Sequence, residues 1–178
     1  MKSKKETSYI ILYTLFGKNL PVSYRLKLAK KIRYFFGKKI LGGIGVDVNI
    51  EKGANFNSNC FIDDYSGIGV DCELNANPGG AIKIGKRVLM GPEVVVYTRN
   101  HSTKRIDISM QEQGYDDPKP VTIEDDVWIC RRVIILPGVK IGKGSVLGAG
   151  AVISKDIPPY SVAVGNPAKI IKDRRNNL

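Results

Sequence analysis

The chain has 178 residues, enough for one compact domain with a small additional segment. Its apolar and charged fractions, 43% and 25%, are ordinary for a soluble globular protein and argue against a disordered or membrane-embedded chain. The three cysteines, Cys60, Cys72 and Cys130, are odd in number and lack CxxC spacing. A disulfide framework or a zinc site is therefore not expected, and a reducing cytoplasm fits best.

The net charge of +11 is concentrated at the N-terminal end of the chain. Residues 1–40 hold eleven Lys and Arg residues and one acidic residue, Glu6, whereas residues 41–178 hold seventeen basic and sixteen acidic residues. Half of the fourteen aromatic residues also lie in residues 1–40. Because the remainder is close to neutral, we expect no nucleic-acid partner and assign the basic charge to an N-terminal arm.

Within this arm, residues 22–36 space their apolar side chains for one face of a helix, and Pro21 suits its first turn. The apolar positions are Val22, Leu26, Ala29, Ile32 and Phe36, and Arg25, Lys27, Lys30, Lys31 and Arg33 lie mostly off that face. The apolar run over residues 9–16 is too short to span a bilayer and lacks a signal-cleavage pattern. We favour helices that cap the domain behind them; the alternative is peripheral contact of residues 1–40 with a membrane interface.

From Ile44 onward, an aliphatic or aromatic residue recurs every six positions. The series is Ile44, Ile50, Phe56, Ile62, Ile68 and Leu74, then Ile84, Met90 and Val96, then Ile123, Ile129, Ile135, Ile141, Leu147 and Ile153. It slips by four residues at Pro78-Gly79-Gly80 and is interrupted after Val96. The fifth position of each hexad is mostly small or β-branched, and the second position is often glycine.

A six-residue period matches neither a helix nor a simple alternating strand. It predicts a short strand that turns a corner every six residues, so that three hexads complete one triangular coil. The large residue would fill the interior, and the fifth residue must be small to share that space. Glycine at the second position is expected where the corner needs a backbone conformation that is costly to other residues. A β-sandwich of short strands is the alternative, but fifteen in-phase positions are hard to obtain otherwise.

Residues 44–172 resemble the hexapeptide-repeat transferase family, most specifically through the motifs IEDDVWI, ILPGVKIGKGSVLGAGAVISKDIPPYS and VGNPAKII. The nearest likeness is to maltose or galactoside and capsular or exopolysaccharide O-acetyltransferases. The resemblance implies an all-β, left-handed parallel β-helix, acetyl-CoA as co-substrate, and a homotrimer with sites between subunits. We therefore expect a basic helical segment over 1–40, a β-helix acyltransferase domain over 41–172 with an inserted loop at 102–120, and a C-terminal tail at 173–178.

The inserted loop is polar and has no hexad period, and long insertions in a regular scaffold usually carry function. His101, the only histidine, stands at its start, where the resembled family has a catalytic histidine. An imidazole titrates near neutrality and can take a hydroxyl proton, so we expect His101 to be a general base for direct acetyl transfer. A surface or packing role is the alternative. Cys130 has no evident basic partner and is not expected to be a nucleophile.

The resemblance also assigns binding residues. Acetyl-CoA would contact Arg131 in WICRR, Ala149 in LGAGA, Ser154 and Lys155 in ISKD, Lys169 and Lys172 in AKIIKD, and Trp128 near the acetyl end; the acceptor would contact Asp71, Asn100 and Tyr115. The lysines would meet phosphates as point charges. Ordinary surface lysines and a coil-packing tryptophan are the alternatives. The family often has Ser or Ala at position 131, arginine at 169 and 172, and asparagine at 71.

The leading interpretation is an acetyl-CoA-dependent O-acetyltransferase. Its acceptor would be a sugar hydroxyl of a surface polysaccharide, of its precursor or of a small glycoside, reached in the cytoplasm or at the inner face of the membrane. One alternative is N-acetylation of an amino sugar or nucleotide-sugar. Another is a non-catalytic β-helix with a structural or membrane-docking role. No metal is expected, because one histidine cannot supply the three that β-helix carbonic anhydrases use.

Overall fold

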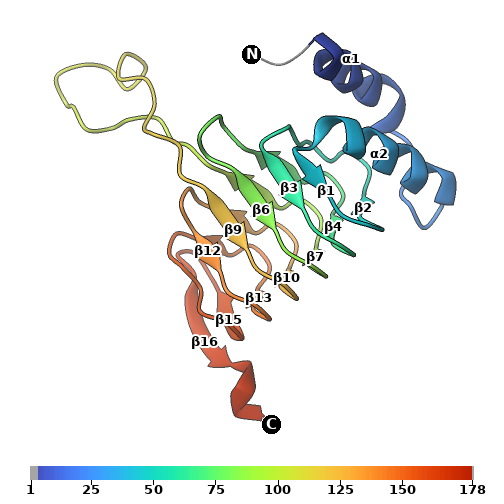
Figure 1. Cartoon of the computed structure of the whole chain (residues 1–178). Helices are drawn as coiled ribbons and strands as arrows, with labels where there is room; N and C mark the ends of the chain where they lie inside the picture. Colours follow the sequence, from blue (N-terminus) through green and yellow to red (C-terminus); the bar gives the residue numbers. More distant parts are fainter. Residues whose placement is uncertain (1–3, 178) are drawn as a thin grey trace.

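The computed structural model describes residues 4–177 as a parallel β-helix with helices at its N-terminal end (Figure 1). Short strands stack into three faces. The first face contains β1 (Gly43–Ile44), β3 (Cys60–Ile62), β6 (Ile82–Ile84), β9 (Val121–Ile123) and β12 (Lys140–Ile141). The second contains a two-stranded sheet of β2 (Asn49–Ile50) and β4 (Gly67–Ile68). Next to β4 it continues as a sheet of β7 (Leu89–Met90), β10 (Trp128–Ile129), β13 (Val146–Leu147), β15 (Ser161–Val164) and the antiparallel β16 (Lys169–Asp173). The third contains β5 (Glu73–Asn75), β8 (Val95–Tyr97), β11 (Ile134–Ile135) and β14 (Val152–Ile153).

The six-residue period sets the register between coils. On the first face Ile44, Ile62, Ile84, Ile123 and Ile141 are direct partners in successive parallel strand pairs. In-phase residues therefore stack on one another along the helix axis, because parallel strands place equivalent side chains on the same face. The expected all-β, left-handed parallel β-helix is confirmed.

The core follows the predicted hexad roles. Ile50, Ile135 and Ile153 are fully buried large residues, and Ala54 and Val133 are fully buried fifth-position residues. Large and small side chains thus share the interior of the prism, as close packing requires.

The second-position glycines are required for a different reason from the one expected. None of them has a positive φ; the left-handed corner residue comes two positions later, for example at Arg87 (φ 55) after Gly85. A Cβ on Gly69 would instead lie 2.2 Å from the carbonyl oxygen of Gly91 in the next coil. The expectation of a strained corner glycine is therefore wrong, and close stacking of successive corners is what excludes a side chain.

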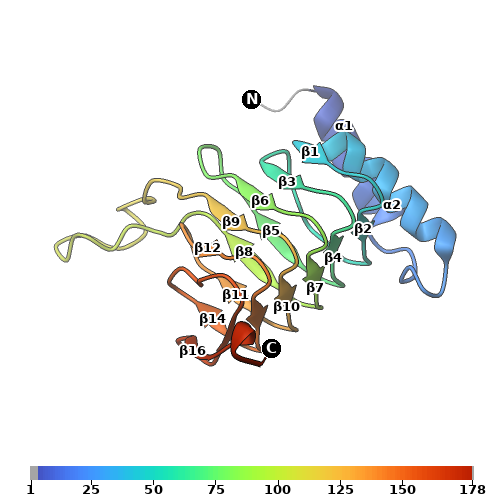
Figure 2. The same ribbon diagram turned by 60° about the horizontal axis from the view of Figure 1, so that its bottom comes forward.

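The N-terminal arm folds into α1 (Lys4–Leu12), a π-helical turn η1 (Tyr13–Gly17) and α2 (Lys27–Ile40). The expected helix over 22–36 is displaced: residues 23–25 form a turn, and Pro21 lies before that turn rather than in the first helical turn. Helix α2 contacts β1 and β2, so the arm covers the N-terminal end of the β-helix (Figure 2). Within residues 4–177, no helix is both long and apolar enough to cross a membrane.

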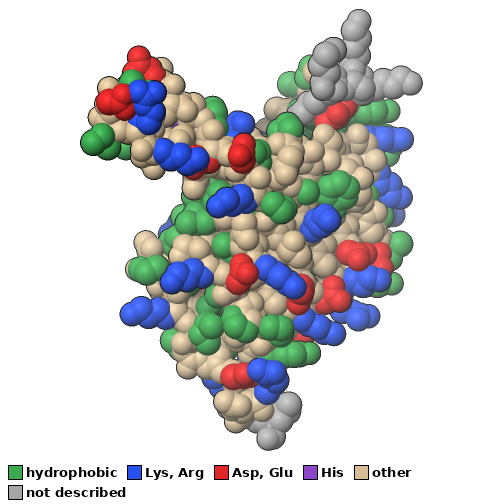
Figure 3. All heavy atoms as spheres, turned by 60° about the vertical axis from the view of Figure 1, so that its left-hand side comes forward, with side chains coloured by type: hydrophobic (Ala, Val, Ile, Leu, Met, Phe, Trp, Pro, Cys, Tyr) green, Lys and Arg blue, Asp and Glu red, His purple; other side chains and the backbone are tan. Residues whose placement is uncertain are grey.

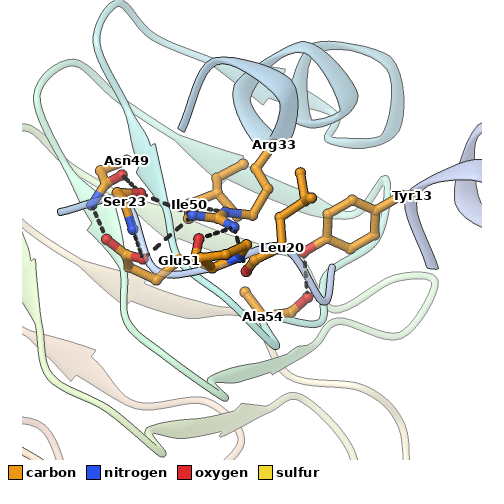
Figure 4. A network of polar contacts seen from close by, with 9 residues as sticks. Tyr13, Leu20, Ser23, Arg33, Asn49, Ile50, Glu51 and Ala54 are labelled. Carbon is orange, nitrogen blue, oxygen red and sulfur yellow. Dashed lines mark hydrogen bonds and ion pairs between the residues drawn. The ribbon is translucent and has the colours of Figure 1, made fainter. Parts of the chain in front are cut away.

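One residue expected on the polar side of the arm, Arg33, is instead completely buried (Figure 4). Its guanidinium donates to the carbonyl oxygens of Ile50 (2.6 Å), Leu20 and Pro21 (3.1 Å each) and to Ser23 Oγ (3.0 Å), and forms an ion pair with Glu51 (3.5 Å). A buried guanidinium needs acceptors for its donors, and the loop before α2 bends back to supply them. This requirement explains why α2 starts later than its apolar spacing predicts.

Candidate active site

The chain leaves the third face after β8 and projects from the body as a narrow loop before it returns at β9 (Figures 1 and 3). The two ends of the loop run antiparallel. Backbone N–H groups of Lys119, Asp116 and Ser102 donate to the carbonyls of Thr98 (2.7 Å), Asn100 (3.0 Å) and Gly114 (3.1 Å). Backbone hydrogen bonds therefore join the two chain segments that form the base of the loop.

Packing against the coils fixes this base. Thr98 is completely buried, and its hydroxyl accepts a hydrogen bond of 2.8 Å from the backbone N–H of Asn77. Gly80 allows Pro118 and Thr98 at the base to approach the coil closely. A Cβ on Gly80 would lie 2.8 Å from Pro118 and 2.9 Å from Thr98. The sequence did not point to Thr98, because the hexad period ends before it.

His101 lies on this anchored base with an exposed side chain. Its Nδ1 is 3.2 Å from the carbonyl oxygen of Gly114. A carbonyl oxygen can only accept, so a hydrogen bond here uses a proton on Nδ1, and in the neutral imidazole the lone pair is then on Nε2. The imidazole is thus held in the tautomer that can receive a proton from a substrate at Nε2.

An aromatic and cationic stack supports the imidazole. The ring of Tyr115 lies 4.2 Å from that of His101, centroid to centroid, with an angle of 32° between the planes. The guanidinium carbon of Arg99 lies 4.0 Å from the Tyr115 centroid, within the range of a cation–π contact. The predicted residues Asn100, His101 and Tyr115 are therefore brought together. Arg99 was missed, since a lone arginine beside an aperiodic loop carries no recognisable signal.

Three of the predicted acetyl-CoA residues meet at the C-terminal end of the β-helix. Ser154, Lys155 and Lys169 line one hollow, together with Ile157 and Ala168. This hollow follows β14, at the same corner of the prism from which the loop leaves after β8. Two inter-strand steps separate β8 from β14, which corresponds to roughly 10 Å along the axis.

The other predicted residues lie elsewhere on the same chain. Asp71, Arg131 and Ala149 occupy the corner between the second and third faces. Arg131 lies near the carboxylate of Glu93, 3.6 Å away. A hydrogen bond from Arg132 is the main cause that lowers the pKa of Glu93. Within one chain, the whole third face of the prism lies between these side chains and His101.

Trp128 and Lys172 lie on the second face. Trp128 pairs in register with Leu89 and Val146 of the neighbouring coils and is 50% exposed. Lys172 pairs with Val162 on the terminal strands. Both side chains belong to the outer surface of the β-helix.

Neither of the rival chemistries receives support from the geometry. Cys130 is partly buried, and this burial raises the pKa of its thiol, which disfavours the thiolate a nucleophile would need. Within residues 4–177, no three His, Cys, Asp or Glu residues are grouped so that they could hold a metal ion.

Comparison with known proteins identifies the family of this chain. The family model "Bacterial transferase hexapeptide (six repeats)" matches residues 120–155. A maltose O-acetyltransferase structure from Clostridium difficile is 31% identical, with a TM-score of 0.64 over 96% of this chain and 86% of that one. The chain belongs to the hexapeptide-repeat acetyltransferase family.

Two further family members extend the comparison. A hexapeptide-repeat acetyltransferase from Vibrio cholerae, solved in complex with acetyl coenzyme A, is 28% identical, with a TM-score of 0.76 over 94% of this chain and 86% of that one. A Schizosaccharomyces pombe protein whose name gives acetyltransferase as its inferred activity is 48% identical over 53% of this chain and 44% of its own length. The chain spans about half the length of the curated relatives it matches.

Proposed function

We propose that the protein is an acetyl-CoA-dependent O-acetyltransferase that acts on a sugar hydroxyl, with His101 as general base. The observation that carries this proposal is the Nδ1 contact of His101 with the Gly114 carbonyl, which leaves Nε2 free to accept a proton. It occurs on the projecting loop of a chain that belongs to an acetyltransferase family. The maltose O-acetyltransferase similarity supports a carbohydrate as the acceptor.

The chemistry is a direct transfer. Nε2 of His101 takes the hydroxyl proton as the acceptor oxygen attacks the acetyl carbonyl, and the carbon–sulfur bond then breaks to release CoA as a thiolate. The imidazolium formed on the way keeps its Nδ1 hydrogen bond to Gly114, which becomes charge-assisted and therefore stronger. No residue needs to carry the acetyl group.

Acetyl-CoA would lie along the corner that joins the C-terminal hollow to the loop. Lys155 and Lys169 border the hollow and would meet phosphate groups, while the acetyl end reaches toward His101. Lys155→Gln and Lys169→Gln should each raise the KM for acetyl-CoA, by about fivefold to tenfold, with a smaller effect on kcat. Lys143→Gln, at a different corner, is the matched control. Equal KM values for acetyl-CoA in all three variants would contradict the placement of acetyl-CoA in this hollow.

A complete site needs a second copy of the chain. Asp71, Arg131, Ala149, Trp128 and Lys172 cannot approach His101 within one prism, whereas two prisms packed side by side can bring one face against the loop of the other. We propose a homotrimer in which each site takes His101 from one subunit and this second group from its neighbour. Mixing His101→Ala subunits with Arg131→Ala subunits should restore activity in the mixed trimers if the groups act across the interface.

An acceptor panel tests the reaction class. The full-length protein is incubated with acetyl-CoA and with sugars in matched pairs that carry a hydroxyl or an amino group at the same carbon, and free thiol release is followed. O-acetylation predicts turnover of the hydroxyl member, and acetyl-ester products that are cleaved by mild base. Turnover of the amino member alone, giving base-stable amides, would favour N-acetylation. The proposed site of action is the cytoplasm.

A further inference from the structure

The N-terminal helices have two apolar surfaces: one packs against the β-helix, and the other is exposed. Tyr13 and Gly17 are buried against the domain, but Ile11, Leu12, Leu15 and Phe16 remain 54%, 41%, 65% and 64% exposed. Spacings of one, three and one residue place these four on one side of α1 and η1. We call them the apolar stripe. Side chains of this size normally lose such exposure by contact with a partner or a membrane.

The same N-terminal arm carries exposed basic side chains. Arg25, Lys27, Lys31, Lys38 and Lys39 are all exposed, and within the described part of the chain none of them forms an ion pair. The ammonium group of Lys39 lies 5.9 Å from the ring of Tyr9 on α1 and 6.0 Å from that of Phe35 on α2, so the charge borders both helices. Lys18 and Lys30 differ from these lysines, because they are bonded to Asn55 and Asp47 of the β-helix.

Exposed large apolar side chains on a helix, with unpaired cations on the same arm, are the pattern of an element that lies in a membrane interface. We propose that α1, η1 and the outer side of α2 dock the protein peripherally on an anionic lipid surface. The apolar stripe would enter the boundary between headgroups and acyl chains, and the lysines would meet the headgroup phosphates. A second copy of the arm is a poor occupant, since residues 1–40 carry eleven basic residues and one acidic residue and would repel one another.

The helices and the loop occupy different parts of the molecule. Figures 1 and 2 show α1 and α2 together at the end of the molecule opposite to β16, and the loop that carries His101 projects to one side. This inference does not depend on the proposed reaction and applies whether or not the protein acetylates a sugar.

Vesicle co-sedimentation of the full chain tests the proposal. Two vesicle types are used: phosphatidylcholine alone, and phosphatidylcholine with phosphatidylglycerol in equal parts. The wild type should bind the anionic vesicles, and high salt should weaken this binding. Leu15→Ser/Phe16→Ser should lower the binding constant by about tenfold or more, because two apolar side chains that would enter the lipid are lost. Lys31→Gln/Lys38→Gln should lower it by about tenfold through lost charge.

The matched control removes exposed apolar side chains elsewhere. Ile106→Ser/Met110→Ser acts on residues of the projecting loop that are 101% and 63% exposed, and should bind vesicles as the wild type does. Thermal unfolding measured by circular dichroism should be the same for all variants. Failure of the wild type to bind anionic vesicles, or wild-type binding by Leu15→Ser/Phe16→Ser, would overturn the proposal. If Leu15→Ser/Phe16→Ser changed the mass measured by light scattering but bound vesicles as the wild type does, the stripe would instead be a contact between copies of the chain.

Discussion

The rings of His101 and Tyr115 face each other across the base of the projecting loop, 4.2 Å apart and tilted by 32°. The ring of Tyr115 thus restricts the imidazole, whose Nδ1 is held by Gly114. Sequence reasoning assigned Tyr115 to acceptor binding, whereas this contact favours a role in positioning His101. The two roles differ in whether the ring or the hydroxyl of Tyr115 matters.

Replacing Tyr115 separates these roles. Tyr115→Ala should lower kcat by about threefold to tenfold, since a contact between rings stabilises an orientation by about 0.5–1.5 kcal/mol. Tyr115→Phe keeps the ring and should retain the wild-type kcat and pH profile. Steady-state kinetics with acetyl-CoA varied at fixed acceptor gives the comparison. A Phe variant as impaired as the Ala variant, with a raised KM for the acceptor, would return Tyr115 to acceptor binding.

Gly80 tests whether the loop base must be anchored. A Cβ in Gly80→Ala would lie 2.8 Å from Pro118 and 2.9 Å from Thr98, so both must move. We expect a loss of about 1–3 kcal/mol in the free energy of unfolding, as for other overpacked sites, together with reduced kcat. Gly67→Ala is the control, because its Cβ would meet nothing closer than 3.5 Å. Urea denaturation that gives the same midpoint for both variants would contradict the anchoring role of Gly80.

The sequence predicted the β-helix because its period reports a repeated packing environment. Ile62, Ile84 and Ile123 occupy equivalent positions in successive coils, so each repeat independently carries the same information. Arg33 could not be predicted in this way: its carbonyl acceptors come from the chain before α2 and from the first coil, and any residue has a carbonyl. An amphipathic pattern scores an arginine as exposed and misses such a site.

The candidate site was predictable in part for the same reason. His101 could be singled out because it is the only histidine and stands where the period stops. Its partners Gly114 and Arg99 could not, since the loop has no period and their contacts depend on how its two ends pair. The separation of Asp71 and Arg131 from His101 also required coordinates, because the hexad period alone does not say which corners contribute to one site.

The buried guanidinium of Arg33 should contribute strongly to stability. Arg33→Met leaves Glu51 without its positive partner and several carbonyl groups without their donor, and we expect a loss of about 3–5 kcal/mol in the free energy of unfolding. Lys30→Met removes a pair with Asp47 whose partners are 36% and 64% exposed, and should cost about 1 kcal/mol or less. Chemical denaturation of both variants provides the test. Similar losses for the two would mean that the arm is not held by Arg33.

The same network predicts a pH dependence. Burial alone would raise the pKa of Glu51, but hydrogen bonds from the Ser23 N–H and from Asn49, with the charge of Arg33, lower it below its ordinary value of 4.5. A group with a depressed folded pKa stabilises the fold above its unfolded pKa, and that stabilisation is lost as pH falls through the folded pKa.

Glu51→Gln tests this sign. The variant should be less stable than the wild type by a constant amount near neutral pH, and the difference should shrink once the pH falls below the ordinary value of 4.5. Unfolding free energies of both proteins, measured from neutral pH into the acid range, give the difference directly. A difference that grows as the pH falls would show that the pKa of Glu51 is raised instead.

Thiol reactivity tests the placement of the hexad side chains. Burial raises the pKa of Cys60 and of Cys72 to about 11, so neither forms thiolate at neutral pH. Cys130 is partly exposed. Iodoacetamide should therefore modify Cys130 in the folded protein, and Cys60 and Cys72 only after unfolding, as peptide mass spectrometry can show. Rapid native labelling of Cys60 would place it outside the core.

The most direct test of the proposed function is thiol release from acetyl-CoA, with an acceptor that the wild type uses, by His101→Ala and by Thr103→Ala. Thr103 is an exposed neighbour on the same loop and serves as the matched control. Loss of the general base should lower kcat by about 10²- to 10⁴-fold, while Thr103→Ala stays near the wild type. A His101→Ala enzyme that is folded and turns over as fast as Thr103→Ala would contradict the assignment of His101 as the base.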